Sequence, residues 1–120
     1  MTPDELEDRL IAFAVKIIEI SELLKKTVAA KNMSAQIARS GTSPALNYGE
    51  ARSAESKKDF VHKAKIVLKE LRETRVSLKI IQLSKLYTGK DSILKSALDE
   101  CNELISIFVS STKTASAKRR

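Results

Sequence analysis

The sequence predicts an all-α protein, an antiparallel up-down four-helix bundle with a kinked second helix. Glycine and proline are scarce, with three and two residues in a chain of 120, which leaves little material for turns and sheets. Apolar residues recur at intervals of three and four along four segments, which is the spacing of one helix face. Short connections separate these segments, and they are typical of bundles whose neighbouring helices run in opposite directions.

The first helix is expected to begin with a capping box. Thr2 is the N-cap, Pro3 occupies the first position, where its missing N–H costs nothing, and Glu5 lies at the third helical position. The expected core face of this helix consists of Leu6, Leu10, Phe13, Ile17, Ile20 and Leu24. A second apolar row, Ile11, Val15 and Ile18, belongs either to a wider core face or to a contact with another partner.

After a relaxed segment at residues 29–32, a second helix is expected from about Met33 to Arg52. Gly41, Pro44 and Gly49 would normally stop a helix, but the four-three spacing of Met33, Ile37, Ser40, Pro44, Asn47 and Ala51 continues through them. We therefore expect one kinked helix, in which Ser40, Ser43 or Asn47 satisfies the carbonyl freed by proline. Gly41 and Gly49 should allow a neighbouring helix to approach closely. A break into two short helices is the alternative.

The third helix is expected from Ser56, its N-cap, to about Tyr87. The fourth is expected from about Ser92 to Thr112, with a continuation beyond Thr112 as an open alternative. Gly89 is the expected left-handed C-cap between them, and Asp91 the next N-cap. The core face of the third helix is Phe60, Ala64, Val67, Leu71, Thr74, Leu78 and Ile81, and that of the fourth is Leu94, Leu98, Cys101, Ile105 and Phe108. Residues 1–112 thus form the bundle domain, and residues 113–120 a basic tail.

A row of cations lies opposite the core face of the third helix. Lys58, Lys65, Arg72 and Lys79 recur every seven residues, and Lys69 lies beside them; we name these five residues the basic rail. Residues 53–87 contain nine Lys and Arg against four Asp and Glu, a net charge of +5 in a chain whose total is +7. Such an excess attracts the phosphate backbone of RNA or DNA. The tail adds the candidate contacts Lys118, Arg119 and Arg120.

Nothing in the sequence indicates an enzyme, a cofactor, a metal site or a small-molecule substrate. Asp59 and His62 imitate half of a di-metal bundle motif, but the chain has one histidine and cannot complete such a site. We interpret Arg39, Glu50, Glu70 and Glu73 as structural ion pairs rather than acid–base groups. A single cysteine in an apolar row, and no secretion signal or membrane span, predict a cytoplasmic protein with no membrane partner.

Two segments carry a resemblance to a known family. Residues 36–51 (QIARSGTSPALNYGEA) and 57–74 (KKDFVHKAKIVLKELRET) are similar to bacterial four-helix-bundle proteins encoded in intervening sequences of 23S ribosomal RNA genes. The family pattern departs from this chain at Ser43, where an aliphatic residue would precede the proline. A related branch is the accessory protein of diversity-generating retroelements, which works with a reverse transcriptase and nucleic acid. The resemblance implies a homopentameric barrel, with the molecular function of the family mostly undetermined.

Two functions remain as hypotheses. The first is a non-enzymatic, basic homo-oligomer that binds RNA or DNA with little sequence preference. The second is a structural oligomer or protein-interaction scaffold, for example an accessory subunit for a nucleic-acid-processing partner such as a reverse transcriptase. Both require a subunit interface, for which the candidates are apolar residues beyond those that one core needs. They are Ile11, Val15, Ile18, Val76, Ile80, Leu83 and Tyr87.

Overall fold

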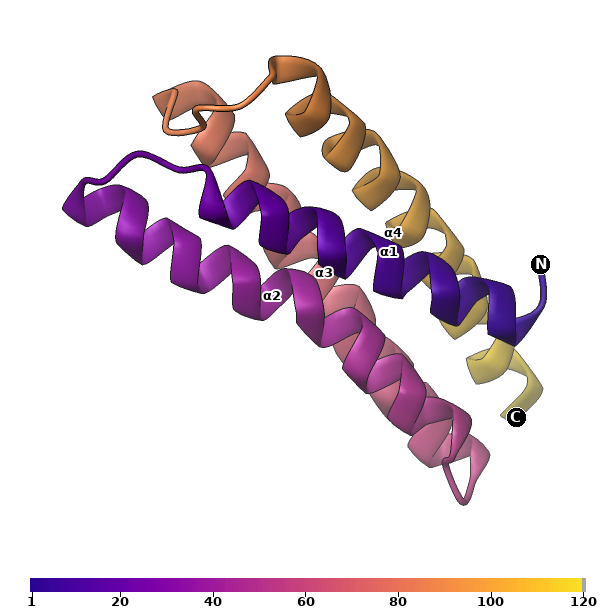
Figure 1. The fold of residues 1–120 in the computed structure, drawn as a ribbon. Coiled ribbons are helices and arrows are strands. Elements are labelled where there is room, and N and C mark those ends of the chain that lie inside the picture. The colour runs from indigo at the N-terminus through magenta and orange to yellow at the C-terminus, as the bar shows by residue number, and fades with distance from the viewer. Residues whose placement is uncertain (120) are drawn as a thin grey trace.

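Four helices joined by three short connections make up the chain. The computed structural model describes the backbone of residues 1–119 and the side chains of residues 1–114. The helices are α1 (Pro3–Glu22), α2 (Val28–Arg52), α3 (Lys57–Ser84) and α4 (Asp91–Arg119), as Figure 1 shows. They form an elongated body of 49 × 23 × 21 Å. The expected all-α fold with four helices is confirmed.

Each helix packs against the next one along the chain, and α1 also meets α4, although less extensively. Within the described residues the backbones of α1 and α3 do not approach each other closely, so the two helices lie across a diagonal. Residues 23–27 and 85–90 lie together at one end, where the Lys25 N–H donates to the Leu86 carbonyl at 2.9 Å and the Thr88 N–H to the Leu23 carbonyl at 2.8 Å. The N-terminus and the connection between α2 and α3 lie at the other end (Figure 1).

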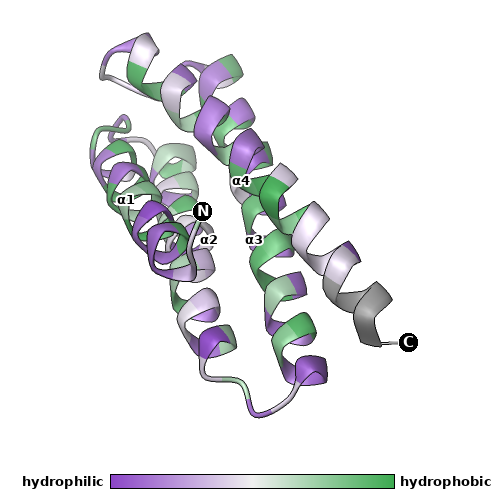
Figure 2. Cartoon of the chain, turned by 90° about the vertical axis from the view of Figure 1, so that its right-hand side faces the viewer, coloured by the Kyte–Doolittle hydropathy of each residue, from purple (hydrophilic) through white to green (hydrophobic). Residues whose placement is uncertain are grey.

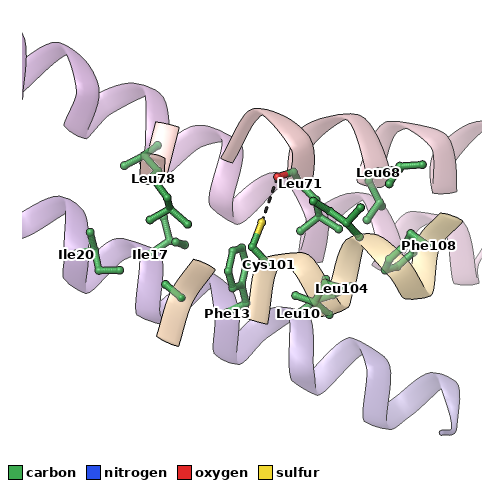
Figure 3. Close-up of a cluster of buried hydrophobic side chains, with 14 of the residues drawn as sticks. Leu10, Phe13, Ile17, Ile20, Leu68, Leu71, Leu78, Cys101, Leu104 and Phe108 are labelled. Carbon is green, nitrogen blue, oxygen red and sulfur yellow. Dashed lines mark hydrogen bonds between the residues drawn. The ribbon is translucent and has the colours of Figure 1, made fainter. Parts of the chain in front are cut away.

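One apolar core runs between the helices. Its largest fully buried side chains are Phe13, Phe108, Leu10, Ile17, Ile20, Ile37, Leu71, Leu78, Ile81, Leu104, Val61 and Val67. Figure 3 shows side chains from α1, α3 and α4 pointing into this shared interior. The core faces expected for α1 and α3 are confirmed, with Leu6 and Phe60 half-buried at their edges. Hydrophilic and hydrophobic residues alternate along the helices in Figure 2, as this one-sided burial requires.

Local capping residues begin α1 and α3 at the expected positions, but α3 ends earlier than expected. Thr2 and Ser56 each accept a hydrogen bond from the backbone N–H three residues on. The helix stops at Ser84 because Lys85 adopts the left-handed conformation, with φ 57° and ψ 37°. The prediction that Gly89 is the left-handed cap is wrong, since no glycine has positive φ. Tyr87 pairs with Leu24 in an isolated bridge, which prevents the helix from continuing to residue 87.

The second helix is longer than expected. It begins at Val28 because the Thr27 side chain accepts a hydrogen bond from the Ala30 N–H at 3.1 Å, so residues 29–32 are helical rather than relaxed. It continues through Pro44 as one helix, which excludes the alternative of two short helices. Its axis changes direction between the two halves in Figure 1. The side chain of Asn47 donates to the Ser43 carbonyl at 3.0 Å, not to the Ser40 carbonyl that Pro44 frees.

The two glycines of α2 have different environments. A Cβ added at Gly41 would lie 2.8 Å from Cβ and 2.9 Å from Cγ1 of Ile17, and closer still to Cγ2, so α1 does approach closely there. A Cβ at Gly49 would meet nothing within 4 Å. The prediction of a close approach at Gly49 is therefore wrong. The reason is geometric, because eight residues turn Gly49 about 80° around the helix from Gly41.

Candidate functional site

The basic rail occupies the outward face of α3. All five of its residues, Lys58, Lys65, Lys69, Arg72 and Lys79, are exposed. Residues seven apart differ by only about 20° around a helix, so the cations remain on one side along most of α3. The opposite side of the same helix carries the buried residues of the core. Amphipathic spacing therefore places the rail in contact with solvent along its whole length.

The rail consists of positive charges that no carboxylate neutralises directly. In the described part of the chain the ion pairs are made by Arg9, Arg39, Arg52 and Lys63, and none involves a rail residue. Lys69 contributes weakly to lowering the pKa of Glu73, whose main cause is the hydrogen bond from Arg39. The charge excess of the chain is thus concentrated where it is free to meet an external anion.

Ion pairs between α2 and α3 bring together the four residues interpreted as structural. Arg39 reaches Glu70 at 3.1 Å and Glu73 at 2.7 Å, and Lys63 reaches Glu50 at 2.6 Å. Glu70 is buried, and the neighbouring hydroxyl of Thr74 donates to its backbone carbonyl at 2.8 Å. These carboxylates accept from cations of the facing helix, so the three ion pairs join α2 to α3.

Three side chains were considered in the sequence as a possible nucleophile or as metal ligands: Cys101, Asp59 and His62. The Cys101 thiol donates to the Leu71 carbonyl at 3.2 Å in the core (Figure 3), and burial raises its pKa to about 12. The thiol is therefore protonated and shielded, which is the opposite of an activated nucleophile. Asp59 and His62 are both exposed. Among the residues described here, no three His, Cys, Asp or Glu side chains are grouped as metal ligands would be.

Six of the seven interface candidates lie outside the core. Ile11, Val15 and Ile18 on α1 are 42% to 49% exposed, and Val76, Ile80 and Leu83 on α3 are 46% to 82% exposed. The row on α1 is therefore not part of a wider core face. Tyr87 differs, because it is half-buried and packs against the core of its own chain. Two apolar rows on opposite sides of the bundle are left without a partner among the residues whose side chains are described.

Two features of the surface were missed in the sequence. The bridge between the connections brings Lys25 and Lys26 beside Lys85, and Lys31 lines the same hollow as Lys25 and Lys26, which makes a second basic cluster at that end of the bundle. A groove of about 610 Å³ separates α1 from α4. The sequence signal for the cluster is the occurrence of lysines in both connections, which is informative only once their pairing is known.

Polar contacts made by residues that line this groove join α4 to α1. Arg9 donates two hydrogen bonds to Glu100, each of 2.7 Å, and also pairs with Glu103. These hydrogen bonds lower the pKa of Glu100. Lys16 donates to the Ser96 hydroxyl at 2.9 Å.

The backbone of α4 continues beyond the predicted end at residue 112, to Arg119. The side chains of the three tail candidates, Lys118, Arg119 and Arg120, lie outside the described residues. A search of the described helices finds none with the length and apolar character of a membrane span.

Two comparisons with known proteins point to the same family. The model of the 23S rRNA-intervening sequence protein family matches residues 6–110. A crystal structure of a protein of unknown function from the S23 ribosomal protein family of Bacteroides thetaiotaomicron VPI-5482 is similar, with 32% sequence identity and a TM-score of 0.81. The match covers 94% of this chain and 99% of that one. No significant match is found among curated proteins. The chain therefore belongs to the 23S rRNA-intervening sequence protein family.

Proposed function

We propose that this protein is a non-enzymatic, basic homo-oligomer that binds the phosphate backbone of RNA or DNA with little sequence preference. The observation that carries the proposal is the rail, whose five exposed cations have no ion-pair partner in the described chain, whereas Arg9, Arg39, Arg52 and Lys63 do. Unpaired cations in a row release counterions from a phosphate chain, and this release supplies affinity without reading bases.

The aromatic residues support backbone contact rather than base recognition. Tyr48, Phe13 and Phe108 are buried, and Phe60 and Tyr87 are half-buried. The chain has no tryptophan, and its one remaining aromatic ring is the exposed imidazole of His62 on α3. Apart from His62, the surface therefore offers no exposed ring for the stacking of bases, which supplies much of the affinity of single-strand binders.

Self-association is the second element of the proposal. We propose that antiparallel up-down bundles join through the exposed apolar rows of α1 and α3, as the homopentameric barrel of related proteins suggests. The three apolar side chains of each row remain largely exposed to water in a single chain, and a second copy could bury them. Val15→Glu should dissociate the oligomer, because it places a charge within the row. Light scattering that finds the wild type monomeric at micromolar concentration would contradict self-association.

A comparison of two basic surfaces tests the binding site. Lys58→Glu with Lys65→Glu reverses the rail, and Lys25→Glu with Lys26→Glu makes the same charge change at the end of the bundle. Gel shifts with short mixed-sequence RNA and duplex DNA at about 50 mM salt should show a large loss for the rail variant and a small one for the other. RNA is the first ligand to test, since the names of the family and of the similar structure refer to ribosomal RNA and a ribosomal protein.

The outcomes separate the proposals. Equal losses of affinity in both variants would show that binding depends on the lysine cluster or on the net positive charge of the whole protein rather than on the rail. Absence of binding by the wild type would favour the alternative, a structural oligomer or scaffold for a nucleic-acid-processing protein such as a reverse transcriptase. In that case the charge of the rail only keeps the protein soluble.

A further inference from the structure

The outward faces of α1 and α3 have the same pattern of apolar residues. The α1 row, Ile11, Val15 and Ile18, has intervals of four and three residues. The α3 row, Val76, Ile80 and Leu83, has the same intervals, and both rows are exposed. On a helix this spacing forms one narrow stripe, which is the pattern that packs helix against helix.

The charges that precede the two rows are opposite in sign. On α1 the exposed carboxylate of Asp8 lies three residues before the row, and that of Asp4, which also pairs with Arg52 of the same chain at 2.8 Å, lies seven residues before it. On α3 the exposed cations Lys69 and Arg72 lie seven and four residues before the row. If the two stripes are aligned in the same direction, the acidic turns of α1 face the basic turns of α3. The two faces are thus complementary both in apolar spacing and in charge.

The fold makes that alignment available between copies but not within one. Because α1 and α3 lie across the diagonal of the bundle, neither can cover the other in the same chain. Both run from the end that holds the N-terminus towards the end that holds residues 23–27 and 85–90 (Figure 1). When copies are arranged side by side around an axis along the bundle, α1 of one copy and α3 of the next therefore run in the same direction.

From these observations we infer that the outward face of α1 packs in parallel orientation against the outward face of α3 in a second copy of this chain. Ile11, Val15 and Ile18 then face Val76, Ile80 and Leu83, and Asp8 lies next to Arg72. The inference rests on the proposed self-association and specifies its geometry. Such a contact joins two different surfaces, so it continues from copy to copy and ends only by closing a ring.

One consequence concerns the rail. Lys69 and Arg72 take part in the subunit contact, and Lys79 lies within it, between Val76 and Ile80. Lys58 and Lys65 lie four or more residues closer to the start of α3 and remain free for a phosphate backbone. The rail therefore has two functions, assembly near the apolar row and ligand contact away from it. This division makes Lys58 and Lys65 the appropriate residues for a binding test.

Disulfide trapping tests which surfaces meet. Val15→Cys and Ile80→Cys are prepared separately, mixed under a mild oxidant, and analysed without reductant. The mixture should form covalent dimers, and each variant alone should form almost none, because Val15 faces Ile80 and not its own copy. The native Cys101 is buried and does not interfere. Crosslinking of Val15→Cys alone would show that α1 meets α1 of another copy, and would overturn the inference.

A charge exchange provides a second test that does not depend on oxidation. Asp8→Lys and Arg72→Glu should each weaken assembly, and the double variant should recover most of it in light scattering. Lys58→Glu makes the same charge change as Arg72→Glu on the same helix and should leave the oligomer intact. A double variant no better than the single ones would refute the pairing while leaving self-association and nucleic-acid binding standing. A monomeric wild type would refute pairing and self-association together.

Discussion

Two substitutions of glycine by alanine in α2 test the packing account most simply. Alanine is favoured over glycine inside a helix by about 1 kcal/mol, and this gain applies equally at Gly41 and Gly49. At Gly49 the new methyl group meets nothing within 4 Å, so Gly49→Ala should stabilise the protein by about 0.5–1 kcal/mol. At Gly41 the methyl group would lie 2.8 Å from Ile17 Cβ, well inside the roughly 3.5 Å at which carbon atoms normally pack.

The difference between the two variants measures the cost of the clash. Overpacking costs about 1–3 kcal/mol, so Gly41→Ala should be less stable than Gly49→Ala by that amount, and Gly41→Leu should fall below the wild type. For a chain of this length the difference corresponds to about 4–12 °C in melting temperature. Thermal unfolding should be measured at one protein concentration, since assembly makes the midpoint concentration-dependent. Equal midpoints for Gly41→Ala and Gly49→Ala would refute the close approach of α1 and α2.

Three further predictions follow from single contacts. The hydrogen bonds from Arg9 lower the pKa of Glu100 in the folded state below its ordinary value of 4.5. The ionised carboxylate therefore stabilises the fold at pH values above 4.5, and this stabilisation is lost as the pH falls through the lowered pKa. Urea unfolding between about pH 6 and 3 should therefore depend less on pH in Glu100→Gln. The buried Cys101 should react with a disulfide reagent at about pH 8 only after unfolding, since burial holds its pKa at about 12. Lys85→Gly should raise the melting temperature slightly, because glycine enters the left-handed conformation without steric cost.

Local patterns were sufficient to predict most of the fold. The core faces of α1 and α3 follow from intervals of three and four residues, and the caps at Thr2 and Ser56 from contacts only three residues long. The start of α2 was missed because Thr27 has no acidic or amide partner at the third helical position, where Ala30 stands. The end of α3 depends on the pairing of Tyr87 with Leu24, a contact far apart in the chain that no local pattern contains.

The candidate site was predictable to a similar extent. The spacing of the rail is a property of one helix, so its residues could be named from the sequence. Whether those cations form ion pairs depends on the neighbouring helices. Only the fold shows that the carboxylates of Glu70 and Glu50 pair with Arg39 and Lys63 rather than with the rail. Whether the second apolar row on α1 belongs to a wider core face also required the fold, which shows Leu10 buried and Ile11 exposed.

The dependence of binding on salt tests the central claim most directly. The affinity of the wild type for duplex DNA should be measured at several salt concentrations from about 50 mM upwards. We predict that the logarithm of the affinity falls linearly with the logarithm of the salt concentration, with a slope that steepens by about 0.9 for each phosphate neutralised. The variant with Lys58→Glu and Lys65→Glu should give a shallower slope. A wild type that does not bind at the lowest salt concentration, or whose affinity does not change with salt, would contradict the assignment of the rail as a nucleic-acid interface.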